Sequence, residues 1–257
     1  MCFSMLLTRF SPDSPAFISP SAVVPKIPGM PARAVSCFSH LTFSRLLDTL
    51  GGEPVAKTAT ANMDITVYKT LFKGVPLALY MIPVGEPAAI GIMEEAAAMG
   101  IERFTVFGTC GVLKKEVSDC AVILPTAAIR DEGASFHYAP PSEEISCNDD
   151  TLLPFTGLLN ELHIHFHTGK TWTTDAFYRE TAEKVEECRR RGCICVEMEA
   201  AGLSAWAKFR GKTLLHFFYA ADNLDSEAWD PRSLSNHALL DEKDKIALLA
   251  AEAAIRI

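Results

Sequence analysis

The sequence predicts an α/β fold with a single domain, in which a central twisted mixed β-sheet is flanked by helices on both sides. Two observations support this prediction. Short apolar runs alternate with helix-forming segments along the chain, and the order strand, helix, strand is typical of a right-handed parallel crossover. The chain has 257 residues, of which 49% are hydrophobic, so it is long enough to bury the core of one large domain.

The first 34 residues differ in composition from the rest of the chain. Prolines recur there at positions 12, 15, 20, 25, 28 and 31, among several serines. A segment of this kind is not expected to fold by itself. We therefore expect residues 1–34 to form a Pro/Ser-rich arm that packs over the domain or a neighbouring subunit, and residues 35–257 to form the α/β domain.

The first predicted elements follow this arm. Residues 41–50 have the spacing of a short amphipathic helix, which a pair of glycines ends. Residues 64–70 alternate between polar and apolar side chains, and residues 75–82 are more strongly apolar. Because a Lys-Gly pair separates these two runs, they predict a β-hairpin.

A helix and a buried strand come next. Residues 88–99 are rich in helix formers, with a proline before them and a glycine after them. Residues 104–107, Phe-Thr-Val-Phe, indicate a buried strand. The Gly-Thr-Cys-Gly sequence at 108–111 then predicts a tight turn at the carboxyl end of that strand.

Residues 120–125 predict another strand, and residues 139–151 predict a loop. The strand expected at 164–168 is unusual because histidines alternate at positions 163, 165 and 167 and so share one face. Such a face is either a metal site or a polar surface. We favour the polar surface and expect no bound metal, because no cysteine lies nearby.

The C-terminal part again alternates between helices and strands. Its charged amphipathic segments predict helices, and its shorter apolar runs predict strands. The expected helices span residues 181–191, 198–209 and 241–257, and the expected strands span residues 193–197 and 213–221.

Carboxylates follow both of these strands. The sequence Glu197-Met198-Glu199 comes at the end of the first strand, and Asp222 comes at the end of the second. The carboxyl ends of parallel strands meet at one edge of a sheet, where α/β proteins bind ligands. We therefore expect these groups to lie together, with one carboxylate holding the hydroxyls of a sugar while another gives a proton to a leaving base.

The composition argues against several classes of protein. A net charge of -8 disfavours binding to nucleic acid, and the one dense basic run, at 189–191, fits a solvated helix end. The eight cysteines form no CxxC pair, which favours buried reduced thiols in a cytoplasmic protein. We expect neither a secretory signal nor a membrane span, because no apolar run has the required length.

Five short segments carry a more specific pattern. They are Gly108-Thr109-Cys110-Gly111, Asp131-Glu132-Gly133-Ala134-Ser135-Phe136-His137-Tyr138, Thr173-Thr174-Asp175-Ala176-Phe177-Tyr178, Val196-Glu197-Met198-Glu199-Ala200-Ala201 and Ala220-Ala221-Asp222. In this order they resemble the purine nucleoside phosphorylase and uridine phosphorylase family, over roughly residues 60–256. The resemblance implies a homo-oligomer, a dimer or hexamer, that needs no cofactor and takes a nucleoside together with inorganic phosphate as cosubstrate.

The resemblance also implies roles at the sugar and the base. Glu199 would bind the ribose hydroxyls, with Met198 and Glu197 beside it, and would favour a cationic transition state. Asp222 would contact the base and act as general acid toward N7 of a purine, and Phe177 would stack on the base. Each residue also has a plainer interpretation: Glu199 as a helix cap, Asp222 as a turn residue and Phe177 as a core aromatic.

The phosphate side follows the family less closely. Thr109 and Gly108 would bind phosphate in the predicted turn, helped by Gly85 near a helix N-terminus, although this turn also fits a simple Gly-rich connection. The arginine that the family carries three residues before the threonine is Val106 here, and no Gly-Asp-Pro-x-x-Arg loop is found. The cations that are candidates to replace these arginines are Arg130, Lys170, Arg179 and Arg232.

Base preference is indicated by two further positions. Uridine-specific members of the family carry Gln and Arg four and six residues after the stacking Phe, where this chain has Thr181 and Glu183. This difference, together with Asp222, favours a purine over a uridine-type base. The leading hypothesis is therefore a nucleoside phosphorylase that yields free base and ribose or deoxyribose 1-phosphate. The alternatives are a nucleosidase that uses water and a nucleoside-binding protein without catalysis.

Overall fold

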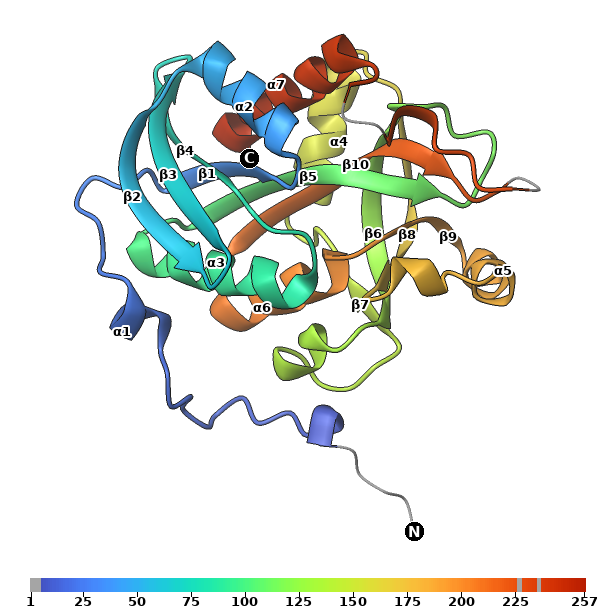
Figure 1. The fold of residues 1–257 in the computed structure, drawn as a ribbon, viewed down its shortest axis with the longest axis horizontal. Coiled ribbons are helices and arrows are strands. Elements are labelled where there is room, and N and C mark those ends of the chain that lie inside the picture. The colour runs from blue at the N-terminus through green and yellow to red at the C-terminus, as the bar shows by residue number, and fades with distance from the viewer. Residues whose placement is uncertain (1–5, 226–227, 235–236) are drawn as a thin grey trace.

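The computed structural model describes residues 6–225, 228–234 and 237–257 as one α/β domain. A sheet of ten strands runs through the molecule, with helices on both of its faces (Figure 1). The predicted fold class, a twisted mixed sheet flanked by helices on both sides, is confirmed.

The strands and helices have the following bounds. The strands are β1 (Arg33–Cys37), β2 (Glu53–Thr60), β3 (Met63–Phe72), β4 (Val75–Met81), β5 (Arg103–Val112), β6 (Val122–Asp131), β7 (Glu144–Ser146), β8 (Phe166–Thr174), β9 (Cys193–Glu197) and β10 (Thr213–Asn223). The helices are α1 (Pro20–Val23), α2 (His40–Leu50), α3 (Glu86–Met99), α4 (Leu152–Glu161), α5 (Ala182–Arg190), α6 (Ala200–Arg210) and α7 (Leu240–Arg256). Short 3-10 turns span Leu6–Thr8 (η1), Ala134–His137 (η2), Phe177–Arg179 (η3) and Arg232–Leu234 (η4).

The order of the strands divides the sheet into a ring and a wing. Strands β10, β6, β8, β9 and β5 follow one another, and β10 also pairs with β5, so that these five strands close a ring. Strands β1, β4, β3 and β2 continue from β5 as an open wing. Within this arrangement β4, β1, β5 and β10 are parallel neighbours, whereas β9 is antiparallel to β5. The closure of the ring was not predicted.

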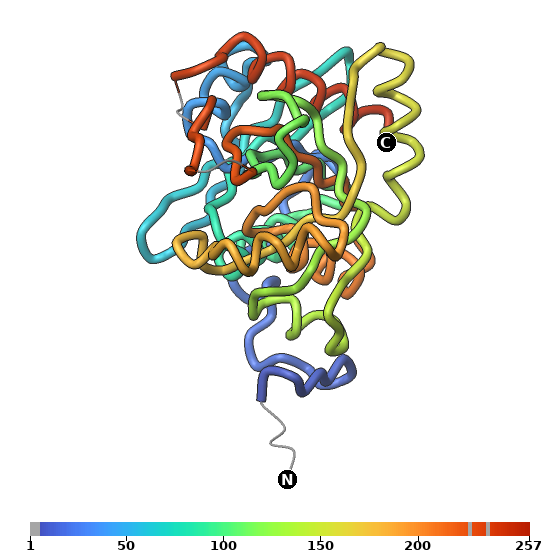
Figure 2. The backbone as a smooth tube through the Cα atoms, turned by 90° about the vertical axis from the view of Figure 1, so that its right-hand side faces the viewer, coloured from blue at the N-terminus to red at the C-terminus, as the bar shows by residue number. Residues whose placement is uncertain are grey.

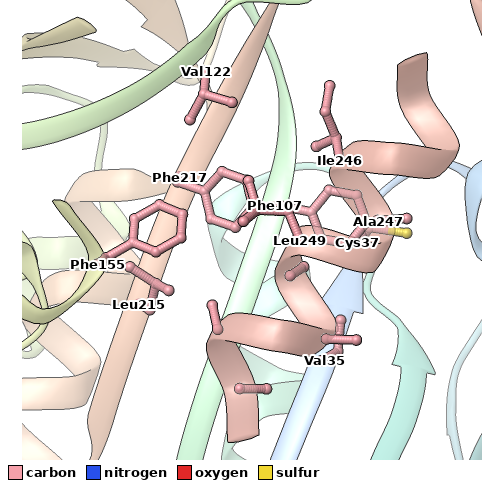
Figure 3. Packing of buried hydrophobic residues seen from close by; sticks show 14 of the residues in the cluster. Val35, Cys37, Phe107, Val122, Phe155, Leu215, Phe217, Ile246, Ala247 and Leu249 are labelled. Carbon is pink, nitrogen blue, oxygen red and sulfur yellow. The ribbon is translucent and has the colours of Figure 1, made fainter. Parts of the chain in front are cut away.

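Two hydrophobic clusters attach the helices to the sheet. On one face, α7 and α2 pack over β1 and β5, and Phe107, Phe217 and Phe155 stack in a row beside them (Figure 3). On the other face, α3 and α6 bury a second cluster that includes Trp206 against Phe104, with ring centroids 5.1 Å apart. Each helix thereby has a fixed position relative to the ends of the central strands.

The predicted hairpin and the helices at 41–50, 88–99, 181–191, 198–209 and 241–257 all occur, with ends shifted by a few residues. Five strands and helices were missed, namely α1, β1, β2, β7 and α4. The loop predicted at residues 139–151 is wrong in part, because β7 lies within it and pairs with β6. β1 begins at Arg33, just before the boundary that composition indicated, and the chain before it extends away from the ring of strands (Figures 1 and 2). Most of this arm is exposed, although Phe10 packs edge-on against Phe209.

The tight turn predicted at residues 108–111 is wrong, because β5 continues through these residues to Val112. Both glycines are instead required by close packing. A Cβ atom on Gly108 would lie 2.7 Å from the ring of Phe38, and one on Gly111 would lie 2.6 Å from Leu224. Glycine in a strand therefore marks close approach here, and not a change of direction.

Candidate active site

Gly111 of β5 is the point at which the two acidic segments meet. It pairs with Asp222 of β10 on one side and with Val196 of β9 on the other. A Cβ atom on Gly111 would lie 3.2 Å from Oδ1 of Asp222 and 3.2 Å from a methyl carbon of Val196. Because this residue has no side chain, the ends of β9 and β10 can approach each other across β5.

The directions of these strands differ from the prediction. Both acidic segments were expected at one carboxyl edge of parallel strands, but β9 runs antiparallel to β5 while β10 runs parallel to it. The segments still meet because the ring closes, so that Val112 pairs with Cys195 on β9 and with Asn223 on β10. The two segments are therefore brought together by the closed ring of strands, and not by the shared edge of a parallel sheet that was predicted.

Asp222 lies at an irregularity near the end of β10. The pairing with β5 skips one residue between Ala220 and Asp222, which is the pattern of a β-bulge, and bulges next to functional sites redirect side chains. Oδ2 of Asp222 accepts a hydrogen bond from Nε1 of Trp229 at 2.8 Å. Burial raises the pKa of Asp222. The turn interpretation fails, because it is Asn223 that accepts the backbone N–H of Asp225.

The carboxylate of Glu197 is buried and accepts four hydrogen bonds from other groups of the protein. Oε2 accepts the backbone N–H groups of Glu199 and Ala200 at 2.7 and 2.6 Å, and Oε1 accepts the hydroxyls of Thr173 at 2.6 Å and Thr171 at 3.3 Å. Burial raises its pKa to about 7 against the effect of these donors. Glu197 therefore caps α6 and fixes the segment that carries Met198 and Glu199, instead of facing a ligand.

Glu199 has a different environment. Its Oε1 accepts the backbone N–H of Gly85 at 2.6 Å, and its side chain makes no capping hydrogen bond to α6. The interpretation of Glu199 as the helix cap is therefore wrong, because Glu197 performs that function. Burial, and then the charge of Glu197, raise the pKa of Glu199 to about 8. Gly85 was predicted to help bind phosphate. Its N–H instead donates to the carboxyl group of Glu199.

The Glu199–Gly85 hydrogen bond connects the starts of α6 and α3, and the carboxyl group of Glu86 forms a second connection between these helices. Glu86, the first residue of α3, accepts the backbone N–H of Gly202 in α6 at 2.5 Å. A Cβ atom at position 202 would collide with this carboxyl group, which explains the glycine. Burial and then the neighbouring Glu132 raise the pKa of Glu86 well above its usual value. Glu86 thus holds the start of α6 against the start of α3.

The segment after β8 presents an exposed aromatic pair. Phe177 is 50% exposed, and its ring lies 4.1 Å from that of Tyr178, so the interpretation of Phe177 as a core aromatic is wrong. Glu180 follows in the same turn, and burial together with the charge of Asp222 raises its pKa to about 7. Thr181 accepts the N–H of Lys184 and caps α5. The segment therefore adds an aromatic face and a second carboxyl group near Asp222.

A pocket of about 210 Å³ lies beside Thr109, at the carboxyl end of β1 and along the middle of β5. We call it the anion pocket. Hydroxyl groups, aromatic rings and one buried lysine line it. Its lining residues are Cys37, Phe38, Ser39, His40, Thr42, Val84, Phe107, Gly108, Thr109, Tyr219, Leu234 and Lys243.

The candidate replacement arginines and lysine do not line this pocket. Arg130 is bound to Ser135 and to the carbonyl of Pro140, and it lies close to Glu132. The other three are Lys170, which pairs with Glu144, Arg232, which donates to the carbonyl of Val117, and Arg179, which is exposed in η3. Val106 is fully buried in the core shared with α3 and α6. Among the residues that the structure describes, the anion pocket is therefore lined by no arginine.

The three histidines predicted to share one strand face do not do so, because β8 begins at Phe166 and His163 has a positive φ in the turn before it. The rings of His165 and His167 lie 5.0 Å apart, edge to face. Within residues 6–225, 228–234 and 237–257, no group of three or more His, Cys, Asp or Glu side chains is arranged to hold a metal ion. The same part of the chain contains no helix with the length and apolar character needed to cross a bilayer.

Three residues of the site were not found from the sequence, namely Glu180, Trp229 and Lys243. Trp229 and Lys243 follow β10 in segments that carry no motif. Trp229 reaches Asp222 where Asp230 pairs with Asn223, and Lys243 reaches the pocket on α7, which packs over β5. Glu180 sits within three residues of the aromatic that was singled out, so its proximity in sequence was the one available signal.

A family model described as the phosphorylase superfamily matches residues 32–257 of this chain. Among curated proteins, a guanosine phosphorylase of Halorubrum lacusprofundi is 28% identical over 150 residues, which are 58% of this chain and 62% of the relative. The Escherichia coli uridine phosphorylase is 24% identical over 165 residues, 59% of this chain and 65% of the relative. A purine nucleoside phosphorylase of Bacillus cereus is 26% identical over 220 residues, 79% of this chain and 90% of the relative. The match to the first two thus spans less than two thirds of their length.

Solved structures share the fold. The crystal structure of uridine phosphorylase from Vibrio fischeri superposes with a TM-score of 0.76 at 18% identity, covering 91% of this chain and 98% of that one. Purine nucleoside phosphorylase from Toxoplasma gondii, in complex with immucillin-H, has a TM-score of 0.72 at 19% identity, covering 88% and 91%.

Proposed function

Because the chain belongs to the phosphorylase superfamily, we propose that it is a nucleoside phosphorylase that cleaves the N-glycosidic bond of a purine nucleoside. In this reaction the bond between C1′ of the sugar and N9 of the base breaks. A bond between C1′ and a phosphate oxygen forms, and the base leaves with a proton. The products are free base and ribose or deoxyribose 1-phosphate.

The observation that carries this proposal is the meeting of Asp222 and the Glu197-Met198-Glu199 segment across Gly111. Two separately held carboxyl groups, Asp222 and Glu199, follow strands on the two sides of β5, and burial raises the pKa of both, so each can take a separate role. Cleavage of an N-glycosidic bond needs this division of roles, since positive charge develops on the sugar while negative charge develops on the base.

Glu199 performs the sugar step in this account. Its carboxylate accepts hydrogen bonds from the 2′ and 3′ hydroxyls and lies close to the developing cation. The N–H of Gly85 holds one of its oxygens, so the carboxylate is already oriented before the nucleoside binds. Glu197 acts behind it, because its four hydrogen bonds fix the backbone that carries Glu199.

Asp222 performs the base step. Burial raises its pKa, which suits a group that gives a proton to N7 of the purine as the bond to C1′ breaks. Trp229 holds one carboxyl oxygen and leaves the other for the base. Phe177, with half of its surface exposed, supplies a face on which the base stacks.

A nucleosidase, in which water replaces phosphate, is the second candidate. The observation that favours it is the composition of the anion pocket, which is lined by no arginine among the described residues. Arginine is the side chain best suited to bidentate binding of phosphate, so its absence weakens the case for a dianion.

Base release from inosine, guanosine, adenosine, uridine and thymidine, each with and without phosphate, tests the proposal. We expect release from the purine nucleosides that requires phosphate. Release that ignores phosphate would establish the nucleosidase, and a preference for uridine or thymidine would overturn the purine assignment. Binding without release from any nucleoside would indicate a nucleoside-binding protein.

A further inference from the structure

The anion pocket combines features that suit a small oxyanion. Its volume of about 210 Å³ exceeds the ~30 Å³ that one water occupies in the liquid several times over. Thr109 from β5 and Thr42 and Ser39 from the start of α2 place hydroxyl groups on its walls. The N-terminal end of α2, an 11-residue helix capped by Ser39, is directed at it, and the helix dipole there favours negative charge.

The arginines nearest in sequence to this pocket do not line it. The first arginine after β1 is Arg45, whose Nε donates to Asp244 at 2.9 Å. Arg33 lies at the opposite end of β1 from the pocket, paired in register with Arg103 at the start of β5. The connection from β1 into α2 that borders the pocket, residues 38–42, reads Phe-Ser-His-Leu-Thr and supplies no guanidinium group.

Lys243 brings a positive charge to the pocket from α7. Its side chain belongs to a residue that is 4% exposed, and it lines the pocket together with Thr109 and Thr42. Its Nζ donates to the carbonyl of Ser233 at 2.8 Å, which orients the ammonium group. A buried ammonium group is costly to desolvate, and a bound anion in contact with it would offset that cost.

We propose that Lys243 is the cation that binds the phosphate cosubstrate, in place of the arginines that this chain lacks at the anion pocket. The proposal rests on the phosphorylase function proposed above. A lysine contacts phosphate as a point charge, without bidentate geometry. Thr109, Thr42 and Ser39 would therefore provide the directional hydrogen bonds, and Lys243 would provide the charge.

The test compares Lys243→Met with Lys245→Met. Lys245 is exposed on the same helix, so its substitution removes an equal charge away from the pocket. Inorganic phosphate and nucleoside are titrated separately by calorimetry, and the KM for each is measured. A charge-assisted hydrogen bond contributes roughly 1.5–3 kcal/mol, so Lys243→Met should weaken phosphate binding about 10- to 100-fold. Nucleoside affinity should change less than about twofold, and Lys245→Met should bind both ligands like the wild type.

Further variants keep the test decisive. Lys243→Arg retains the charge and should recover part of the phosphate affinity, and Lys243→Gln replaces the Met variant if circular dichroism shows that the latter is unfolded. A folded neutral variant with wild-type phosphate KM would overturn the assignment of Lys243 alone. A wild-type protein that neither binds phosphate nor requires it would overturn the phosphorylase proposal itself, and this inference with it.

Discussion

The two halves of the candidate site are built in different ways. On the side proposed to bind sugar and base, the Glu197-Met198-Glu199 segment and Asp222 belong to chain segments that flank Gly111, and Glu199 accepts a hydrogen bond from Gly85. On the phosphate side, Thr109 is present, but the arginine positions are occupied by other residues, and hydroxyl groups and Lys243 line the pocket. One half follows the family's sequence pattern and the other departs from it.

This difference separates two physical requirements. Two carboxyl groups must be held in separate, fixed positions, and here strand pairing and the backbone N–H of Gly85 do so through contacts that tolerate little change. An anion needs only positive potential and a few donors, which different elements can supply. We therefore expect substitutions on the carboxylate side to reduce turnover by orders of magnitude, and substitutions in the anion pocket mainly to raise the KM for phosphate.

The largest effect is expected from Asp222→Asn. Asparagine keeps the shape and can still accept from Trp229, but it cannot give a proton to N7. General-acid catalysis contributes about 10²- to 10⁴-fold, so kcat/KM for inosine should fall by about that factor. Steady-state kinetics measures this loss, with Asp48→Asn, on the exposed side of α2, as the control.

A nucleoside whose base is already charged tests whether Asp222 acts as the general acid. The base of 7-methylguanosine already carries a positive charge and leaves without a further proton, so Asp222→Asn should cleave it at close to the wild-type rate. An equal loss on inosine and on 7-methylguanosine would mean that Asp222 holds the structure or the base, and does not act as the acid.

A somewhat smaller effect is expected from Glu199→Gln. The amide keeps one acceptor for the sugar hydroxyls but removes the negative charge beside the developing cation. Losing one such electrostatic contact typically costs about 10²- to 10³-fold in kcat. Glu53→Gln, an exposed substitution at the start of β2, is the matched control. If kcat for Glu199→Gln stayed near the wild-type value, the assignment of Glu199 to the sugar step would be wrong.

The smallest expected effect concerns pH. In the free protein, burial and then Glu197 raise the pKa of Glu199 to about 8, so below that pH the carboxyl group is mostly protonated. The ionised form accepts hydrogen bonds from both sugar hydroxyls, and nucleoside affinity should therefore rise as the pH increases. If the ionised form alone binds, Kd decreases about tenfold between pH 7 and pH 9.

Calorimetric titration of inosine at several pH values measures this dependence, and Glu199→Gln should remove it. A Kd that is independent of pH in the wild type would show that the charge of Glu199 does not contribute to binding. A dependence that persists in the variant would assign it to another group, such as Glu180, whose pKa burial and Asp222 raise to about 7.

Local patterns in the sequence were sufficient to predict the fold class and most helices. The amphipathic spacing of residues 41–50 and the glycine that ends residues 88–99 are local signals, and both helices form. Closure of the ring was not predictable, because the pairing of β10 with both β5 and β6 depends on contacts between segments about a hundred residues apart. The glycines of β5 were misread for the same reason, since the side chains of Phe38 and Leu224 determine their role.

In the candidate site, too, local motifs were predictable and tertiary contacts were not. The Glu-Met-Glu segment and Asp222 were identified from motifs, but which of the two glutamates caps α6 depends on where each carboxyl group points after the chain folds. Lys243 could not have been found, because only the packing of α7 over β5 brings it to the pocket, and Trp229 carries no motif although it follows Asp222 by seven residues. Residues held by backbone geometry were thus predictable, and residues brought in by tertiary packing were not.

The proposal that phosphate is the nucleophile is tested by following what happens to phosphate during the reaction. Protein, inosine and inorganic phosphate are mixed and followed by phosphorus NMR while base release is measured. If the protein is a phosphorylase, a sugar 1-phosphate resonance grows at the expense of inorganic phosphate, with one equivalent formed for each hypoxanthine released. Hypoxanthine and free ribose with an unchanged phosphate resonance would contradict it and would identify water as the nucleophile.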